Sequence, residues 1–182
     1  MNLDFSNDQK LLQDEASKFL IKEEALKANR AVMETKSNYD PELWQKIVQL
    51  GWTGIRIPEE FGGLGLGHLE LCVIAEELGR QLAPVPFSSS VYLFTEALLE
   101  FASEEQKTQI LPQLVSGEVV GTFAMAETAA APTEQNLVVN YADGKLSGKK
   151  IAVPDAEVAS HAIVVAKELS LIHISEPTRH RG

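Results

Sequence analysis

Arg56-Ile57-Pro58-Glu59-Glu60-Phe61-Gly62-Gly63-Leu64-Gly65-Leu66-Gly67 is the stretch around which the chain is organised. Four glycines fall within its last six residues, directly after a Pro-Glu-Glu-Phe run. Glycine adopts positive φ without steric cost, so this composition predicts a tight irregular loop. Leu64 and Leu66 keep the loop apolar, and we expect it to pack onto a core. The stretch lacks Gly-Lys-Ser/Thr and follows no clear strand, which argues against a phosphate-binding loop and favours a connector between helices.

The composition is that of a globular chain with an acidic balance. Its 182 residues are 45% apolar and 23% charged, with a net charge of -10, which suits one domain or two small ones. The negative charge argues against nucleic acid and against anionic membrane surfaces. No apolar run approaches the length of a membrane span and no secretory signal is visible, so we expect a cytoplasmic location. The single cysteine, Cys72, excludes an internal disulfide.

A first helix is predicted near the N-terminus. Ser6 and Gln9 have the spacing of a capping box, in which each side chain bonds the other residue's backbone. Residues 22–30 are charged and expected to be solvated, and residues 35–39 are expected to form a loop. The predicted buried face of the first helix consists of Leu12, Ala16, Phe19 and Leu20.

A second helix is predicted directly before the glycine loop. Asp40 is its expected N-cap, Pro41 occupies its first turn, and Gly51 ends it. Trp44 could stack on a ligand, but its spacing favours a place in the core. The predicted buried stripe of this helix consists of Leu43, Trp44, Ile47 and Leu50.

Three further helices are expected after the glycine loop. Residues 69–79 are apolar on most sides, which predicts a central helix buried all round, with Cys72 inside it as a small inert hydrophobe. Ser90 is the expected cap of the next helix. Ser103 begins another with a second capping box, and Pro112 is expected to kink or end it. The predicted inward residues of the Ser90 helix are Leu93, Phe94, Ala97, Leu98 and Phe101.

Two candidate sites are excluded by the spacing of their residues. Glu76 and Glu77 are adjacent, so on a helix they point in different directions and do not form a paired acid and base. His161 has no second histidine and no nearby cysteine or aspartate cluster, so we expect no metal site.

The pattern changes from helix to strand after Gly117. Asp143-Gly144 is expected to form a hairpin turn. An all-α block of about 115 residues therefore precedes the beginning of an all-β domain. The predicted strands are residues 119–126, 136–141, 145–150 and 161–166.

Three motifs, taken in order, resemble one known family. They are Pro58–Gly65, Ala75–Arg80 and Ser103–Glu118, and their order and spacing are similar to the N-terminal helical domain of the acyl-CoA dehydrogenases. The resemblance covers about residues 1–168 and implies an α+β chain. The implied domains are an all-α helical N-terminal domain, residues 1–117, and a truncated β-barrel-like middle domain, residues 118–168.

The resemblance implies an oxidoreductase of lipid metabolism. Acyl-CoA dehydrogenases use bound FAD to introduce an α,β double bond into an acyl-CoA thioester: a carboxylate base takes the α proton and the flavin takes the β hydride. The base usually lies in a C-terminal domain that this chain does not include, so no catalytic residue is named and the chain itself is expected to be inactive. The resemblance also implies electron-transfer flavoprotein as acceptor and a homo- or hetero-oligomer for the intact protein.

Two segments resemble those that contact the flavin in this family. They are residues 123–133 and 148–154. The backbone N–H groups of residues 125–127 are the main implied donors, and ordinary strand and loop packing is the alternative for every position. Lys149 and Lys150 are expected to be solvated charges at a strand end, with phosphate contact as the alternative. The implied flavin-contacting residues are Phe123, Met125, Ala126, Glu127, Ala152 and Val153.

Both segments depart from the family pattern. Ala126 stands where the family usually has a flavin-bonding threonine, and Pro132 stands where it has a serine, so two hydroxyls and one backbone N–H are lost. Ala152 stands where an aromatic residue usually covers the flavin. These losses are similar to divergent subunits of heteromeric acyl-CoA dehydrogenases, which makes a non-catalytic partner subunit the alternative function. A generic helical binding module is a third hypothesis, which the three ordered motifs disfavour.

The C-terminal residues have a different character. Residues 169–179 resemble the in-frame translation of a sequencing-library adapter, so residues 169–182 are interpreted as an artefactual tail and the natural chain as truncated near Glu168. A natural divergent C-terminus is the alternative. A truncation there would leave an exposed strand edge after Ala166, which predicts poor solubility.

Overall fold

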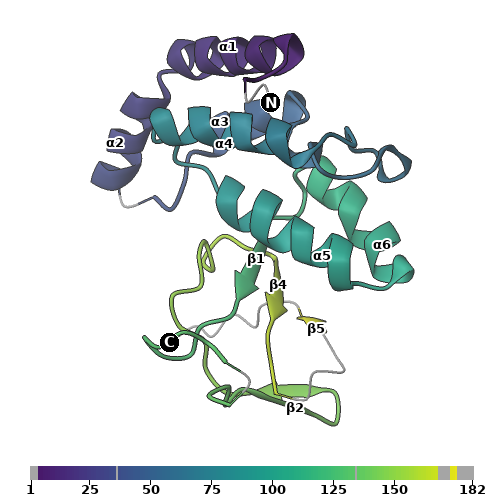
Figure 1. The fold of residues 1–182 in the computed structure, drawn as a ribbon. Coiled ribbons are helices and arrows are strands. Elements are labelled where there is room, and N and C mark those ends of the chain that lie inside the picture. Colours follow the sequence, from purple (N-terminus) through teal and green to yellow (C-terminus); the bar gives the residue numbers. More distant parts are fainter. Residues whose placement is uncertain (1–3, 36, 134, 168–172, 176–182) are drawn as a thin grey trace.

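A computed structural model describes residues 4–35, 37–133, 135–167 and 173–175. A helical region comes first in the chain and a region of short strands follows, so the predicted α+β organisation is confirmed (Figure 1). The helices are α1 (Asn7–Lys22), α2 (Ala25–Thr35), α3 (Pro41–Gln49), α4 (His68–Arg80), α5 (Thr95–Phe101) and α6 (Glu104–Val115), with the 3-10 turns η1 (Trp52–Gly54) and η2 (Glu59–Phe61) and the π-helix η3 (Ser88–Phe94). The strands are β1 (Gly121–Ala124), β2 (Asn140–Ala142), β3 (Lys145–Ser147), β4 (His161–Val164) and β5 (His173–Ser175).

The helix starts follow the local capping chemistry. Ser6 and Ser103 each form the predicted capping box, and the Asp40 carboxylate accepts from the first turn of α3. Helix α2 was not expected, because its sequence was interpreted only as a charged, solvated stretch. It forms after a left-handed residue, Glu24, at φ 51°, and it buries Ala25 against the core. Ala25 and the 2.9 Å hydrogen bond from the Asn29 amide to the Leu82 carbonyl therefore dock a largely exposed helix.

After α3 the chain turns at Gly51, forms η1 and enters the glycine loop, residues 56–67. Backbone contacts hold this loop more than its leucine side chains do. An added Cβ at Gly63 would lie 2.0 Å from the carbonyl oxygen of Ile57, so only glycine permits this approach. The amide N–H of Leu64 donates to the Gly54 carbonyl at 2.9 Å. Leu64 and Leu66 remain 44% and 37% exposed, so the expectation that they pack onto the core is wrong.

Helix α4 is buried on one face only. Helix α1 packs along it (Figure 1), and the inward residues of α4 include Val73 and Ile74. On the outer face, Leu69 is 58% exposed and Cys72 is exposed. The prediction of a helix buried all round, with Cys72 inside it, is therefore wrong. The outer face of α4 is therefore exposed although some of its residues are apolar.

The segment after α4 forms a π-helix where an ordinary capped helix was expected. Ser90 does not cap it; the Ser90 hydroxyl is buried and accepts the Gly121 N–H at 3.1 Å. A π-helix winds more residues into each turn and so changes the phase of its apolar stripe. Phe94 and Leu98 are buried as predicted, whereas Leu93 and Phe101 are exposed.

One further prediction in the helical region is wrong and another is tested only in part. Leu50 at the end of α3 is exposed, because the predicted stripe extends one residue beyond the last helical turn. Pro112 does not end α6, which continues to Val115, and the kink expected as the alternative stays a prediction. The loss of one amide donor at Pro112 is tolerated there because Leu111 and Leu114, on either side of it, are fully or almost fully buried.

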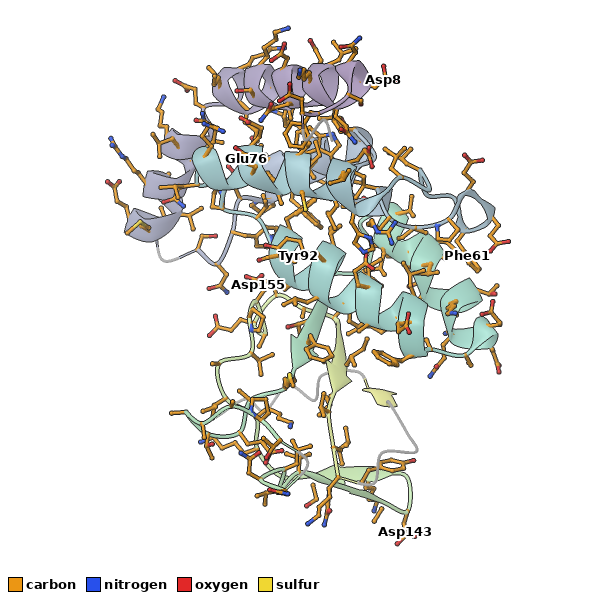
Figure 2. The ribbon with its side chains drawn as sticks, viewed as in Figure 1. Asp8, Phe61, Glu76, Tyr92, Asp143 and Asp155 are labelled. Carbon is orange, nitrogen blue, oxygen red and sulfur yellow. The ribbon has the colours of Figure 1, made fainter. Side chains whose placement is uncertain are left out.

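The strand region contains a parallel pair and a hairpin. Strands β1 and β4 are parallel, and β2 and β3 are antiparallel around the predicted Asp143-Gly144 turn, where both residues have positive φ. Figure 2 shows Asp143 at the tip of this hairpin, far from the helices. Each strand is shorter than predicted. Strand β5 lies within the tail interpreted as artefactual and pairs antiparallel with β4; the origin of that tail stays a prediction.

The core consists of two apolar clusters. The first lies among α1, α3 and α4, and the second joins α5 and α6 to the strand region through Val119 and Ile163. In the part of the chain that the structure describes, no helix is long and apolar enough to cross a membrane. Within the same residues, no group of three or more histidine, cysteine or acidic side chains is arranged to hold a metal ion.

Candidate functional site

The two segments singled out by the sequence lie beside each other in the strand region. The chain leaving β1 includes Met125, Ala126 and Glu127, and the chain leaving β3 includes Lys150 and Ile151. The Ile151 N–H donates to the Ala126 carbonyl at 2.8 Å, which joins the two segments through their backbones. The structure therefore brings together residues that lie about 25 positions apart in the sequence.

A buried ion pair holds these segments in place. The Lys150 Nζ lies 2.7 Å from Oε1 of Glu127, and the two side chains are only 8% and 7% exposed. The same ammonium group donates to the Met125 carbonyl at 2.9 Å. Lys150 is therefore not the solvated strand-end charge that the sequence suggested, although its neighbour Lys149 is exposed as expected.

The Glu127 carboxylate also binds a third segment, which leads into β2. The Val138 N–H donates to Oε2 at 2.6 Å and the Val139 N–H donates to Oε1 at 3.0 Å. The hydrogen bond from Lys150, together with these two backbone donors, lowers the pKa of Glu127 below its ordinary value. Glu127 is thus an ionised, fully engaged structural carboxylate and does not have the environment of a general base.

The candidate backbone donors remain available. In the described part of the chain, the N–H groups of Met125, Ala126 and Glu127 have no protein acceptor. The Met125 side chain is 42% exposed, whereas Phe123 is committed to the second apolar cluster. Of the predicted contact residues in the first segment, residues 125–127 therefore present N–H groups that no described residue accepts, and Phe123 packs in the second apolar cluster.

The second segment turns sharply at Ala152. Ala152 is exposed with φ 50°, and Val153 lines a shallow pocket of about 380 Å³ next to Asp155. This segment is fastened from both sides: the Thr122 hydroxyl donates to the Pro154 carbonyl at 2.5 Å, and the buried Ser89 hydroxyl lies 2.6 Å from Oδ2 of Asp155. Figure 2 shows Asp155 at the junction between the strand region and the helix above it.

The residues fit a flavin by their backbone and not by their side chains. Backbone N–H donors such as those of residues 125–127 suit the carbonyl oxygens and ring nitrogens of FAD, which are hydrogen-bond acceptors. Ala126 and Pro132 offer no hydroxyl, and the exposed methyl of Ala152 covers little area. The described residues therefore offer a flavin backbone donors, with fewer side-chain bonds and less aromatic cover than the family pattern supplies.

Two elements of this site were not found from the sequence. The Glu127–Lys150 pair spans 23 positions, and Ser89–Asp155 spans 66. For the first pair, the sequence offered one signal: Glu127 and Lys150 each lie within a segment that resembles a flavin contact. Opposite charge alone, however, does not predict which residues form an ion pair.

The fold is of the α+β class, with a helical region followed by a region of short strands. The profile of the acyl-CoA dehydrogenase N-terminal domain matches residues 6–118. The chain belongs to the acyl-CoA dehydrogenase family.

Individual relatives agree with this assignment. Mitochondrial isovaleryl-CoA dehydrogenase of Solanum tuberosum is 31% identical over 90% of this chain and 41% of its own length. The ChsE4-ChsE5 complex of Mycobacterium tuberculosis is similar over 97% of this chain and 49% of that chain, with a TM-score of 0.83 and 26% identity. An acyl-CoA dehydrogenase complexed with FAD from Bacillus anthracis gives a TM-score of 0.76 at 26% identity, over 90% of this chain and 30% of that one. The chain spans about two fifths of the length of the curated relatives it matches.

Proposed function

We propose that this chain is part of an FAD-dependent acyl-CoA dehydrogenase that introduces an α,β double bond into an acyl-CoA thioester. The observation that carries the proposal is the set of free amide donors at residues 125–127, held against the segment of Lys150 in a chain of this family. FAD, when bound, would accept the hydride removed from the β carbon of the acyl group. Electron-transfer flavoprotein is the proposed acceptor of the electrons, and the cytoplasm the proposed location.

Within this proposal the described residues bind and orient. The N–H groups of Ala126 and Glu127 would donate to the polar edge of the flavin. Val153 and the exposed turn at Ala152 would lie beside the ring, held by Thr122 and Ser89 through Pro154 and Asp155. Removal of the α proton needs a carboxylate, and no described carboxylate is assigned that role, so the base is proposed to lie in a part of the protein outside this chain.

The decisive experiment begins with the source DNA. A long read across the codons for residues 165–182 would show whether the reading frame continues past the adapter-like stretch into a further helical domain. The continuous protein is then expressed, and its flavin content and its oxidation of acyl-CoA thioesters with an artificial electron acceptor are measured. We expect bound FAD and activity from the continuous protein, and no activity from the 182-residue chain. A continuous protein with FAD but no dehydrogenation would contradict the proposal.

A second candidate function is a non-catalytic partner subunit of a heteromeric dehydrogenase. The observations that favour it are the side chains missing at Ala126, Pro132 and Ala152. The ChsE4-ChsE5 likeness adds a precedent for a complex of two such chains. The continuous protein purified alone would then lack flavin and would gain it only together with a second subunit. Stoichiometric FAD in the protein purified alone would contradict this alternative.

A further inference from the structure

We propose that Lys150 is a positioning residue for the flavin: its ammonium group holds the Met125 carbonyl and thereby directs and strengthens the Ala126 N–H as a donor to the flavin. The inference deepens the proposed function and rests on it. It assigns a role to a side chain that the sequence suggested was merely solvated.

The first step of the argument is the geometry of the peptide between Met125 and Ala126. A trans peptide is planar, with its C=O and its N–H on opposite sides. The Met125 carbonyl is fixed on the side of Lys150 by the 2.9 Å hydrogen bond from Nζ. The Ala126 N–H of the same peptide is therefore directed away from Lys150, and no described residue accepts from it.

The second step is that Lys150 itself has a defined position. Its side chain is only 8% exposed, and its ammonium group lies between two acceptors, the Met125 carbonyl and the Glu127 carboxylate. Glu127 is in turn held by the N–H groups of Val138 and Val139. A flexible lysine is thus immobilised by three segments of the strand region, and the orientation of the peptide is determined by long-range contacts.

The third step is electrostatic. A cation bound to a carbonyl polarises the whole peptide, so the N–H on its other side becomes a stronger donor. The effect is larger where the surroundings are less polar than water, and the two side chains of this ion pair are only 8% and 7% exposed. The Glu127 N–H supplies an internal comparison, because its preceding carbonyl, that of Ala126, is held by the neutral Ile151 N–H and not by a charge.

The experiment compares matched variants of the 182-residue chain. Lys150→Met removes the ammonium group, and Lys149→Met is the control, since it removes the adjacent lysine that is exposed. Lys150→Arg keeps a charged donor. The double variant Glu127→Gln/Lys150→Met removes the charge from both partners and leaves no unpaired ion buried, so it keeps the test valid if Lys150→Met does not fold.

The first measurement is the amide orientation without flavin. Residual dipolar couplings and chemical shifts of the ¹⁵N-labelled chain report the direction and environment of the Ala126 N–H. We expect the couplings and the shift of the Ala126 N–H to change in Lys150→Met and in the double variant. They should stay the same in Lys149→Met and be largely retained in Lys150→Arg. The signals of Ala162 in β4 should not change in any variant. A thermal midpoint that falls in the double variant with no change at Ala126 would mean a structural role only and would overturn the inference.

The second measurement is FAD affinity, by quenching of flavin fluorescence. We expect binding to weaken about tenfold in Lys150→Met and the double variant, the size of one well-aligned hydrogen bond, with Lys149→Met unchanged. Equal affinities for the Lys149 and Lys150 variants would overturn the inference. If the 182-residue wild type binds no FAD, the affinities are compared in the continuous protein; failure of that protein to bind FAD would count against the proposed function alone, since the dipolar couplings then decide whether Lys150 directs the Ala126 N–H.

Discussion

The helical region, residues 7–115, and the strand region, residues 119–175, are held together by different kinds of contact. In the helical region, two apolar clusters fill the space between helices, and the capping contacts join residues only three positions apart. In the strand region, three short segments meet at one buried ion pair, Glu127–Lys150. Both regions therefore depend on buried apolar area, which in the strand region includes Leu137, Val139 and Ile163, and the strand region depends in addition on this ion pair.

This difference determines which kind of substitution destabilises each region. Buried apolar area responds to the loss of volume and hardly to pH. A buried ion pair adds little net stability over an apolar replacement, but removal of one partner is costly because the other charge is left without compensation. The two regions share the second apolar cluster, so a change at that junction should affect both.

The largest effect is expected where the two regions meet. Phe94 is fully buried, and an added Cβ at Gly121 of β1 would lie 2.2 Å from its ring, so the ring packs directly on the first strand. Phe94→Ala is expected to cost about 3–5 kcal/mol of unfolding free energy. Urea unfolding followed by tryptophan fluorescence reports the helical region, and hydrogen exchange of β4 reports the strand region. Phe101→Ala is the exposed control, and a comparable loss there would contradict the role of the junction.

The next effect concerns the glycine loop. Gly63→Ala is expected to cost about 3 kcal/mol, because the new methyl group would meet the Ile57 carbonyl at 2.0 Å and must displace backbone. Gly62→Ala meets no neighbouring atom and is strained only by its φ of 86°, so it should cost about 1 kcal/mol. Thermal unfolding of the two variants separates steric contact from backbone strain. Equal losses would show that the close approach at Gly63 is not what holds the loop.

A smaller effect is expected on the pH dependence of the strand region. The folded pKa of Glu127 lies below its ordinary value of 4.5, mainly because of the Lys150 hydrogen bond. Its contribution to stability is therefore fully present above that pH and is lost as the pH falls through the folded pKa. The double variant Glu127→Gln/Lys150→Met lacks this titration, so the protection factors of the β4 amides, which correct for the intrinsic pH dependence of exchange, should fall less between pH 6 and pH 3 than in the wild type.

The comparison of wild type with double variant also controls for a second carboxylate whose pKa is lowered. Glu70 in α4 has a lowered pKa, chiefly through its hydrogen bond from Gln9, and it lies in the helical region. Its contribution is common to wild type and double variant and cancels in the difference. An identical pH dependence in the two proteins would show that the ion pair does not stabilise the strand region.

The smallest effect is a local one in the helical region. Ser103 caps α6, and its side chain accepts the Gln106 N–H at 3.3 Å. Ser103→Ala should lower the free energy of unfolding by about 1 kcal/mol. The loss should be confined to α6, which urea unfolding with hydrogen exchange of that helix can resolve. A loss as large as that of Phe94→Ala would mean that the helical region depends on its caps as much as on its apolar clusters.

The sequence predicted the elements whose causes are local. Ser6, Asp40 and Ser103 begin helices through side chains within three residues of the backbone they cap. The Asp143-Gly144 turn forms where two residues that tolerate positive φ meet. The α+β order and the family also followed from local motifs. Local motifs carry this information because their geometry is complete within a few residues.

Burial was predicted less well, because it depends on neighbours that are distant in sequence. Leu64, Leu66, Leu69 and Cys72 are apolar enough to be buried, yet all four are exposed in the folded chain. Ser90 has the chemistry of a cap, but the π-helix turned its hydroxyl to Gly121. In each case the side chain's preference was known and its environment was not.

The candidate site shows the same division between sequence and structure. By itself the sequence determined which segments resemble flavin contacts, and which hydroxyls Ala126 and Pro132 lack, since both depend only on residue type. Only the tertiary structure decided that the Lys150 side chain is buried, that it bonds Met125 and Glu127, and that none of the described residues accepts the Ala126 N–H. The physical reason is that an ion pair forms between whichever charges the chain brings together out of water, and that pairing is a property of the folded backbone.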